Sequence, residues 1–309
     1  MNVRHLILAC AGLLLSAPAL ALNILLTNDD GYRHPNIRAL YQELKAQGHT
    51  VRIAAPYADQ SGRAGAFLYG REVVPGRDDD PAYPDSYYVK TTQDGTCQSP
   101  ACAGQEVTVE ISGTPVMAAL YGLEKLLPRA DLVISGPNVG NNLGYVNNFS
   151  GTFNAALIAL HSGVPALAVS ADLKERDAAG VARIVARLVR DLDNARVAGA
   201  PLLPKGVGLN VNLPPLAGLK GIKYTQVGTY LPFALTYTDD LGDLNPAARG
   251  RFGLSFKYAA PASASDTTAE AVWVQQGYLT ISPFNGVPGT PGHEALRALG
   301  RWADTLCLP

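Results

Sequence analysis

The chain has 309 residues, of which 47% are hydrophobic, so it can bury a large core as one big domain or as a domain with a smaller appendage. Its 25 Lys and Arg residues balance 26 Asp and Glu residues, without a long run of like charge. This balance argues against binding of a nucleic-acid polymer, which favours a basic excess.

The first 21 residues have the pattern of a secretory signal peptide. The apolar stretch 6–15 is too short to span a bilayer, and Ala-Leu-Ala at 19–21 fits a cleavage site. We therefore expect an exported, periplasmic protein that begins at Leu22 and has no membrane anchor. The alternative is a lipoprotein signal at Cys10, although the apolar stretch before Cys10 would then be only a few residues long.

Export would place the remaining cysteines in an oxidising compartment. Cys97 and Cys102 bracket four residues in a stretch rich in Gly, Pro and Ser, which favours a small local disulfide loop. Cys307 is then left over, either free or bonded to another copy of the chain. A zinc site is disfavoured because no second pair of Cys or His residues lies nearby.

A short apolar run opens the mature chain and ends abruptly in two carboxylates. Residues 22–31 contain Ile-Leu-Leu-Thr followed by Asn-Asp-Asp-Gly, which is typical of a buried strand that ends in a turn. Asp29 and Asp30 then lie at the carboxyl end of the strand, the edge where open α/β sheets bind ligands. The alternative is that this segment is only a turn.

The next elements complete a β-α-β unit. Residues 35–48 have the apolar spacing of a crossover helix, and residues 50–55 are predicted to form a second strand. Right-handed crossovers make the two strands parallel, so the turns that follow them open on the same edge of the sheet. Ser61 in the second turn can therefore lie near Asp29 and Asp30.

Residues 71–106 break this pattern and are predicted to form a surface excursion, with a hairpin around residues 87–91 and 107–111. Three successive aspartates at 78–80 suggest a metal site. Their position before Pro81, far from any apolar strand, instead favours a solvated loop.

A second glycine-rich turn follows a buried strand at residues 131–135. Asn138 lies in this turn, and a helix is predicted to begin at Ser150, Gly151 and Thr152. Small residues free backbone N–H groups to face an anion, and the hydroxyl of Ser150 or Thr152 would lie beside a helix N-terminus. This is not a Walker loop, because the Gly-Lys-Ser/Thr signature is missing. The alternative is a turn that binds no ligand.

Alternating strands and helices over residues 22–213 predict one three-layer, Rossmann-like α/β domain with a mostly parallel sheet, which would be the catalytic domain. Residues 214–309 are predicted to be a β-rich extension that closes over the site or mediates oligomerisation. Its predicted elements are strands at 222–227, 253–258 and 272–281 and a terminal helix at 294–306.

The three strand ends supply Asp29, Asp30, Ser61 and Asn138, whose oxygen atoms suit Mg²⁺, Mn²⁺ or Ca²⁺. With an anion-binding loop beside them, the natural substrate is a phosphate that the metal activates for hydrolysis. Asp29 is the candidate nearest the chemistry, as ligand and as base or nucleophile, and Asp30 is a ligand or orients one. His34 can reach the pocket, although a surface histidine is the commoner case.

At these residues the chain resembles the SurE family of metal-dependent nucleotidases. The matching stretches run in family order across most of the mature chain: 24–31, 55–56 with 60–62, 113–115, 135–144, 150–152, 209–212 and 277–283. The resemblance implies dephosphorylation of nucleoside 5′- and 3′-monophosphates, and a homodimer or homotetramer whose C-terminal parts exchange elements. It also implies one divalent ion per subunit, Mg²⁺ or Mn²⁺, with Ca²⁺ as an ion that a crystal could hold.

By position, the resemblance assigns two sets of residues. The metal ligands would be Asp29, Asp30, Ser61 and Asn138, and the phosphate pocket would be lined by Asn142, Ser150, Gly151 and Thr152. The rival hypotheses are an exported nucleotide-binding protein without turnover and a broad-specificity acid phosphatase. A serine hydrolase is disfavoured because the sequence lacks a Gly-x-Ser-x-Gly elbow.

Overall fold

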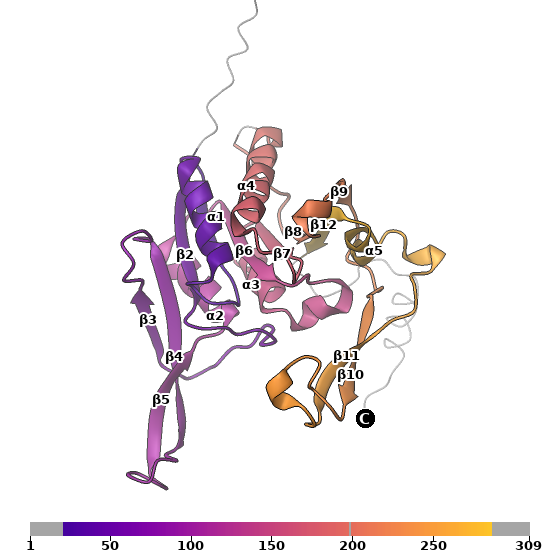
Figure 1. Cartoon of the computed structure of the whole chain (residues 1–309). Helices are drawn as coiled ribbons and strands as arrows, with labels where there is room; N and C mark the ends of the chain where they lie inside the picture. Colours follow the sequence, from indigo (N-terminus) through magenta and orange to yellow (C-terminus); the bar gives the residue numbers. More distant parts are fainter. Residues whose placement is uncertain (1–20, 198, 286–309) are drawn as a thin grey trace, which may run out of the picture.

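A computed structural model of the chain describes residues 21–197 and 199–285, so the predicted signal peptide up to residue 20 and the predicted helix at 294–306 lie outside it. A ten-stranded mixed sheet forms the centre of the fold, in the order β3-β4-β2-β1-β6-β7-β8-β12-β9 with β5 paired to β4 (Figure 1). Its strands are β1 (Asn23–Thr27), β2 (Thr50–Pro56), β3 (Val73–Arg77), β4 (Ser86–Thr96), β5 (Glu106–Ser112), β6 (Leu132–Val139), β7 (Ala166–Ala171), β8 (Val207–Leu213), β9 (Gly221–Tyr224) and β12 (Tyr278–Asn285).

The five strands β2, β1, β6, β7 and β8 are all parallel, as predicted. The α-helices are α1 (Pro35–Ala46), α2 (Pro115–Tyr121), α3 (Gly151–His161), α4 (Ala178–Ala195) and α5 (Glu270–Gln275). Within the part of the chain that the structure describes, no helix combines the length and apolar character needed to cross a bilayer.

Helices cover both faces of the parallel strands and complete three layers. Ile24 and Leu26 of β1 pack in the same apolar cluster as α1 and α4. Leu25, which points to the opposite face of the strand, packs in a second cluster with side chains of α3. All three side chains are fully buried, so the continuous apolar run in the sequence reflects a strand covered on both faces. The predicted three-layer α/β class is confirmed.

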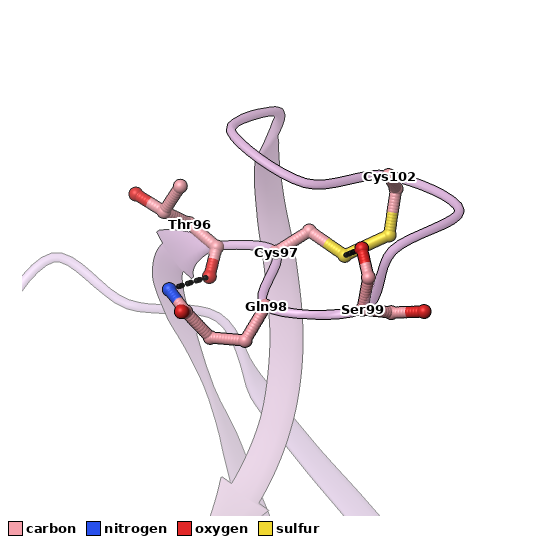
Figure 2. Close-up of a disulfide and its surroundings, with 5 residues drawn as sticks. All are labelled: Thr96, Cys97, Gln98, Ser99 and Cys102. Atoms are coloured by element: carbon pink, nitrogen blue, oxygen red, sulfur yellow. Dashed lines mark hydrogen bonds between the residues drawn. A yellow bond between two sulfur atoms is a disulfide. The ribbon is translucent and has the colours of Figure 1, made fainter.

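The hairpin predicted around residues 87–91 and 107–111 is present, and its two strands are longer than expected. β4 pairs antiparallel with β5, for example Thr91 with Ile111, and also parallel with β2, so it belongs to the main sheet. The outer half of the hairpin projects from the body of the fold (Figure 1). In the loop between β4 and β5, Cys97 and Cys102 are joined in a disulfide (Figure 2).

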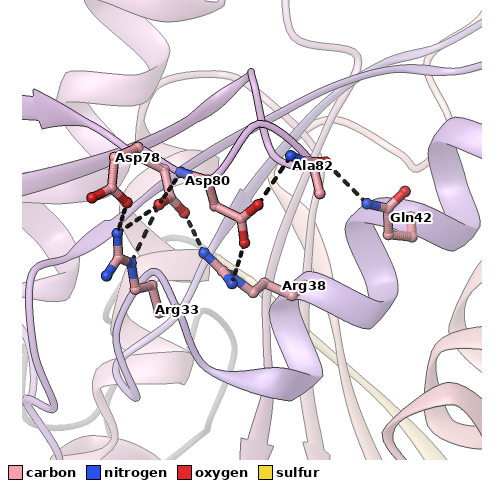
Figure 3. Close-up of polar contacts among 7 residues, drawn as sticks. Arg33, Arg38, Gln42, Asp78, Asp80 and Ala82 are labelled. Atoms are coloured by element: carbon pink, nitrogen blue, oxygen red, sulfur yellow. Dashed lines mark hydrogen bonds and ion pairs between the residues drawn. The ribbon is translucent and has the colours of Figure 1, made fainter.

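The expectation of a solvated loop at residues 78–80 is wrong for Asp78. Its side chain is fully buried, and its two carboxylate oxygens accept from Arg33 at 3.0 Å and from Arg38 at 2.5 Å (Figure 3). The side chain of Asp79, in contrast, is 86% exposed. Burial raises the pKa of Asp78, but the hydrogen bonds from Arg38, the Asp80 backbone and Arg33 outweigh it and lower the pKa below its usual value. The loop is therefore fastened to the start of α1 by ion pairs.

The strands between residues 214 and 285 are divided between two sheets. β9 and β12 extend the main sheet, whereas β10 (Phe233–Thr238) and β11 (Gly253–Tyr258) form a separate antiparallel pair, the predicted β-rich part (Figure 1). The prediction of a strand over 272–281 is wrong for its first residues, which belong to α5. Glu270, Ala271 and Val274 have helical spacing and form one buried face, and β12 begins only after Gly277, whose φ is +89°.

Candidate functional site

Three strand ends meet at one edge of the sheet. The turn after β1 touches the turn after β2, because the Gln60 backbone N–H donates to the Asp29 carbonyl at 2.7 Å. The start of α1 touches the end of β6, where Asn36 Nδ2 donates to the Pro137 carbonyl at 3.0 Å. Parallel strand ends thus bring together the segments that carry the four predicted metal ligands.

Asp29 lies against the N-terminus of α3. It is 3% exposed, and its Oδ1 accepts a hydrogen bond of 2.6 Å from the Thr152 hydroxyl. A Cβ atom at Gly151 would lie 2.7 Å from Asp29 Cβ, so only glycine allows this close approach. Burial raises the pKa of Asp29, and the hydrogen bonds from Thr152 partly offset this effect.

Asp30 places a second carboxylate beside the first. Burial, followed by the charges of Asp29 and Asp59, raises the pKa of Asp30 to about 7. Its Oδ2 atom is buried and has no hydrogen-bond partner among the described residues. A buried, unpaired carboxylate oxygen is costly unless a cation or a proton neutralises it.

Ser61 lies in the loop after β2, whereas Asn138 lies inside β6, one residue before its end, and not in a turn after residue 135 as predicted. The side-chain oxygens of both residues keep free lone pairs. The Ser61 hydroxyl donates to Asp59 Oδ1 at 2.7 Å and is exposed. Asn138 is 8% exposed, and its Nδ2 donates to the Gly140 carbonyl at 2.7 Å, which directs its oxygen to the other side of the amide. Asp59 is a third carboxylate near the pair that sequence reasoning missed, although its place two residues before Ser61 is a usable signal.

The described residues contain no group of three or more His, Cys, Asp or Glu side chains suited to hold a metal ion. The ligand set expected from the sequence has only two carboxylates, Asp29 and Asp30, and takes its other donors from a hydroxyl and an amide. Those assignments therefore stay predictions.

The start of α3 has the chemistry expected of an anion site. Ser150 is the N-cap, and its Oγ accepts from the Phe153 backbone N–H at 3.1 Å. Ser150, Gly151 and Thr152 are all buried, and the Thr152 backbone N–H also faces Asp29. The helix N-terminus thus points at the edge that carries the two carboxylates.

Asn142 is held in the interior. It is 7% exposed, its Nδ2 donates to Ser170 Oγ at 2.9 Å, and its carbonyl accepts from Asn210 and Asn212 of β8. These bonds fix the loop after β6 to β7 and β8. A direct role of Asn142 in binding phosphate stays a prediction.

His34 is not the exposed surface histidine that the sequence favoured. It is half-buried and caps α1, because its Nδ1 accepts from the Asn36 backbone N–H at 3.3 Å. Burial lowers the pKa of His34.

Glu270 is a buried polar residue that sequence reasoning missed. It is fully buried, and its carboxylate accepts hydrogen bonds from the Gly144 backbone, Asn147, Asn210 and Ser282. Burial raises the pKa of Glu270 to about 7. The sequence signal that could have indicated a buried polar partner is the Asn-Val-Asn run of β8. Two asparagines on one face of a buried strand require polar partners.

Comparisons with known proteins find similar sequences that belong to one family. A family model described as "Survival protein SurE" matches residues 24–231. The chain is 31% identical to the 5'-nucleotidase SurE of Actinobacillus succinogenes over 289 residues, which cover 92% of this chain and 99% of that protein. It is also 31% identical to the 5'/3'-nucleotidase SurE of Yersinia enterocolitica over 266 residues, which cover 85% and 91% of the two chains.

Two further similarities bear on activity and fold. An acid phosphatase of Yarrowia lipolytica is 35% identical over 216 residues, which cover 62% of this chain but only 56% of that protein. The crystal structure of the SurE protein from Aquifex aeolicus superposes with a TM-score of 0.67 at 24% identity, covering 91% of this chain and 99% of that one. The second similarity supports the fold.

Proposed function

This chain belongs to the SurE family, and we propose that it is a metal-dependent phosphomonoesterase that releases phosphate from nucleoside 5′- and 3′-monophosphates. The observation that supports this most strongly is the position of Asp29 against the N-terminus of α3, with Asp30 as its neighbour in the chain. The carboxylates would hold a cation, and the helix N-terminus would hold a phosphate.

The donor atoms fit a divalent ion. Asp30 Oδ2 has no hydrogen-bond partner among the described residues, and Thr152 occupies only one oxygen of Asp29. The Ser61 hydroxyl donates its proton to Asp59, so the lone pairs of its oxygen can still bind a cation. Asn138 donates through Nδ2, so its side-chain oxygen can also act as a ligand. When bound, Mg²⁺ or Mn²⁺ supplies Lewis-acid polarisation of the phosphoryl group.

Residues of this chain would bind the phosphate and orient the reacting groups. Backbone N–H groups at the start of α3 bind and orient the phosphate, and Thr152 holds Asp29 in one rotamer through Oδ1. Asp29 Oδ2 is the oxygen that this bond leaves free. We assign to it the contact with the reacting group, as metal ligand and as base or nucleophile.

Phosphate release from 5′- and 3′-AMP tests this proposal. We expect chelation to abolish release, Mn²⁺ or Mg²⁺ to restore it, and Asp29→Asn to abolish it, whereas Asp79→Asn at an exposed carboxylate keeps it. Activity that survives both chelation and Asp29→Asn would overturn the proposal. Binding of AMP that raises Tm without phosphate release over hours would instead indicate a nucleotide-binding protein.

The acid phosphatase among the relatives favours a second candidate function, a phosphatase of broad specificity. A panel of nucleoside monophosphates, glycerol phosphate and p-nitrophenyl phosphate at pH 5 and pH 7.5 separates the two. A nucleotidase has kcat/KM values at least tenfold higher for the nucleotides. Equal values across the panel would favour the broad phosphatase.

We also propose export to the periplasm. The disulfide between Cys97 and Cys102 supports it, because such bonds persist in oxidising compartments. Expression of the full chain in a Gram-negative host, followed by mass spectrometry of the periplasmic fraction, should give a mature N-terminus at Leu22. An uncleaved cytoplasmic chain would contradict this proposal.

A homodimer or homotetramer is the assembly that we propose. In the β10–β11 pair, Leu235, Leu254 and Phe256 are 44–55% exposed, which favours burial against another subunit. Light scattering on the purified chain should give a mass of two or four subunits. A monomeric mass at micromolar concentration would contradict it.

A further inference from the structure

The Glu270 carboxylate joins three parts of the chain that are far apart in sequence. It accepts from Ser282 on β12 at 2.8 Å and from Asn210 on β8 at 3.0–3.1 Å. From the loop after β6 it accepts the Gly144 backbone N–H at 3.1 Å and Asn147 Nδ2 at 3.4 Å. Both carboxylate oxygens are therefore satisfied by neutral donors.

This arrangement restrains the loop strongly. A fully buried carboxylate is costly unless its lone pairs are occupied, so a loop that moved away would leave Glu270 and its own donors unpaired. Apolar contacts act in the same direction, because Leu143 packs in one cluster with Ala271 and Val274 of α5. The C-terminal part thus holds the loop by polar and apolar contacts together.

The restrained loop leads directly into the start of α3. Gly144–Phe149 forms a 3₁₀ segment that ends at the N-cap Ser150. The Asn147 carbonyl accepts from Asn154 Nδ2 of α3 at 3.2 Å, so the loop and the helix are also tied side by side. The next residue after the cap, Gly151, packs against Asp29, and Thr152 donates to it.

We propose that Glu270 is a positioning residue, which sets the first turn of α3 against Asp29 by anchoring the Gly144–Phe149 segment to the C-terminal part of the sheet. The kinetic part of this inference rests on the proposed phosphatase function. The structural part, restraint of the loop by one buried carboxylate, does not.

The test compares three variants by amide hydrogen exchange and by steady-state kinetics. Glu270→Gln keeps the shape but turns an NH₂ group toward the donors, and Asn147→Ala removes only the loop side of the contact. The matched control is Thr225→Val, which removes a hydrogen bond of 2.8 Å to Ser282 in the same corner of the sheet but none to the loop. All are measured in the full mature chain with saturating Mn²⁺ and AMP.

For Glu270→Gln we expect peptides covering residues 142–152 to exchange at least about tenfold faster while the β1–β2 peptides keep their protection. We expect kcat to fall by about 10- to 100-fold with KM within threefold, because a small displacement of a catalytic element is enough for that loss. Asn147→Ala should show the same pattern with smaller changes, and Thr225→Val should show neither.

Two results would overturn the proposal. One is unchanged exchange of the loop in Glu270→Gln, and the other is loosening of the loop with an unchanged kcat, which would make Glu270 merely structural. Wild-type protein that releases no phosphate would instead refute the proposed function. The exchange comparison would then still decide whether Glu270 restrains the loop.

Discussion

The Thr152 hydroxyl donates a hydrogen bond of 2.6 Å to Oδ1 of Asp29, although the two residues lie 123 positions apart. Both side chains are buried, and the bond connects the carboxyl end of β1 to the first turn of α3. It therefore links the predicted metal-binding half of the site to the predicted phosphate-binding half.

Thr152→Val removes the hydroxyl and keeps the shape of the side chain. Because Asp29 Oδ1 is then buried without its donor, we expect the free energy of unfolding to fall by about 1–3 kcal/mol. We also expect phosphate release to fall at least about tenfold, since Asp29 loses its fixed orientation. Urea unfolding and a phosphate assay check both, and Thr152→Ser, which keeps the hydroxyl, should retain most of the activity. Equal behaviour of the Val and Ser variants would contradict this role.

Asp30→Asn should raise the stability of the metal-free protein and weaken its stabilisation by a metal ion. Burial and the charges of Asp29 and Asp59 all disfavour the negative charge of Asp30. When a chelator keeps the site free of metal, removal of this charge should raise the free energy of unfolding by roughly 1–2 kcal/mol. In Mn²⁺ at one hundred times its Kd, the wild type should gain about 2.7 kcal/mol and the variant almost nothing. Thermal unfolding with and without Mn²⁺ measures this difference. An equal gain in both proteins would show that Asp30 is not a ligand.

Asp78→Asn should destabilise the fold, although Asp78 lies outside the site. Its buried carboxylate pairs with Arg33 and Arg38, so the variant leaves the Arg38 guanidinium partly uncompensated, and we expect a loss of about 1–3 kcal/mol. The matched control is Asp79→Asn, whose exposed side chain should contribute less than about 1 kcal/mol. Urea unfolding measures the free energy of unfolding of both variants. Equal losses in the two variants would contradict a stabilising role of the Asp78 ion pairs.

The sequence predicts the centre of the site because one topological rule acts on it. Asp29 and Ser61 each follow a strand of a parallel sheet, Asn138 lies in the last two residues of a third strand, and right-handed crossovers bring such strand ends to one edge. The apolar run of β1 and the Gly-rich turn after β6 are local signals that need no knowledge of distant contacts. Fold class and the location of the site follow from them.

The missed residues depend on contacts that no local pattern encodes. Asp78 sits among aspartates before a proline, and its partners on the α1 side lie 40 and 45 positions away. Glu270 lies in a helix of six residues that resembles a strand in composition, and it bonds to Gly144 across 126 positions. Burial of these carboxylates is a property of the assembled sheet, so it becomes visible only in the structure.

Stability should depend on pH through Glu270, and the sign follows from its pKa. Burial raises the pKa of Glu270 from 4.5 to about 7. Below pH 4.5 the carboxyl is protonated in both the folded and the unfolded chain, so its contribution to stability is complete. Between pH 4.5 and about 7 the unfolded chain ionises first, and this contribution is lost as the pH rises. At about 1.4 kcal/mol per pH unit, the loss amounts to roughly 3 kcal/mol.

Glu270→Gln should remove this dependence because glutamine does not ionise. In urea unfolding at pH 5, 6, 7 and 8, we expect the variant to be less stable than the wild type at pH 5 and the gap to narrow as the pH rises to 7. The partners of Glu270, namely Gly144, Asn147, Asn210 and Ser282, are all neutral, so other titrating groups should affect both proteins equally and cancel in the difference. A difference that stays constant from pH 5 to 8 would show that Glu270 keeps an ordinary pKa in the folded protein. A gap that widens with pH would mean that its donors hold the carboxylate ionised and lower its pKa instead.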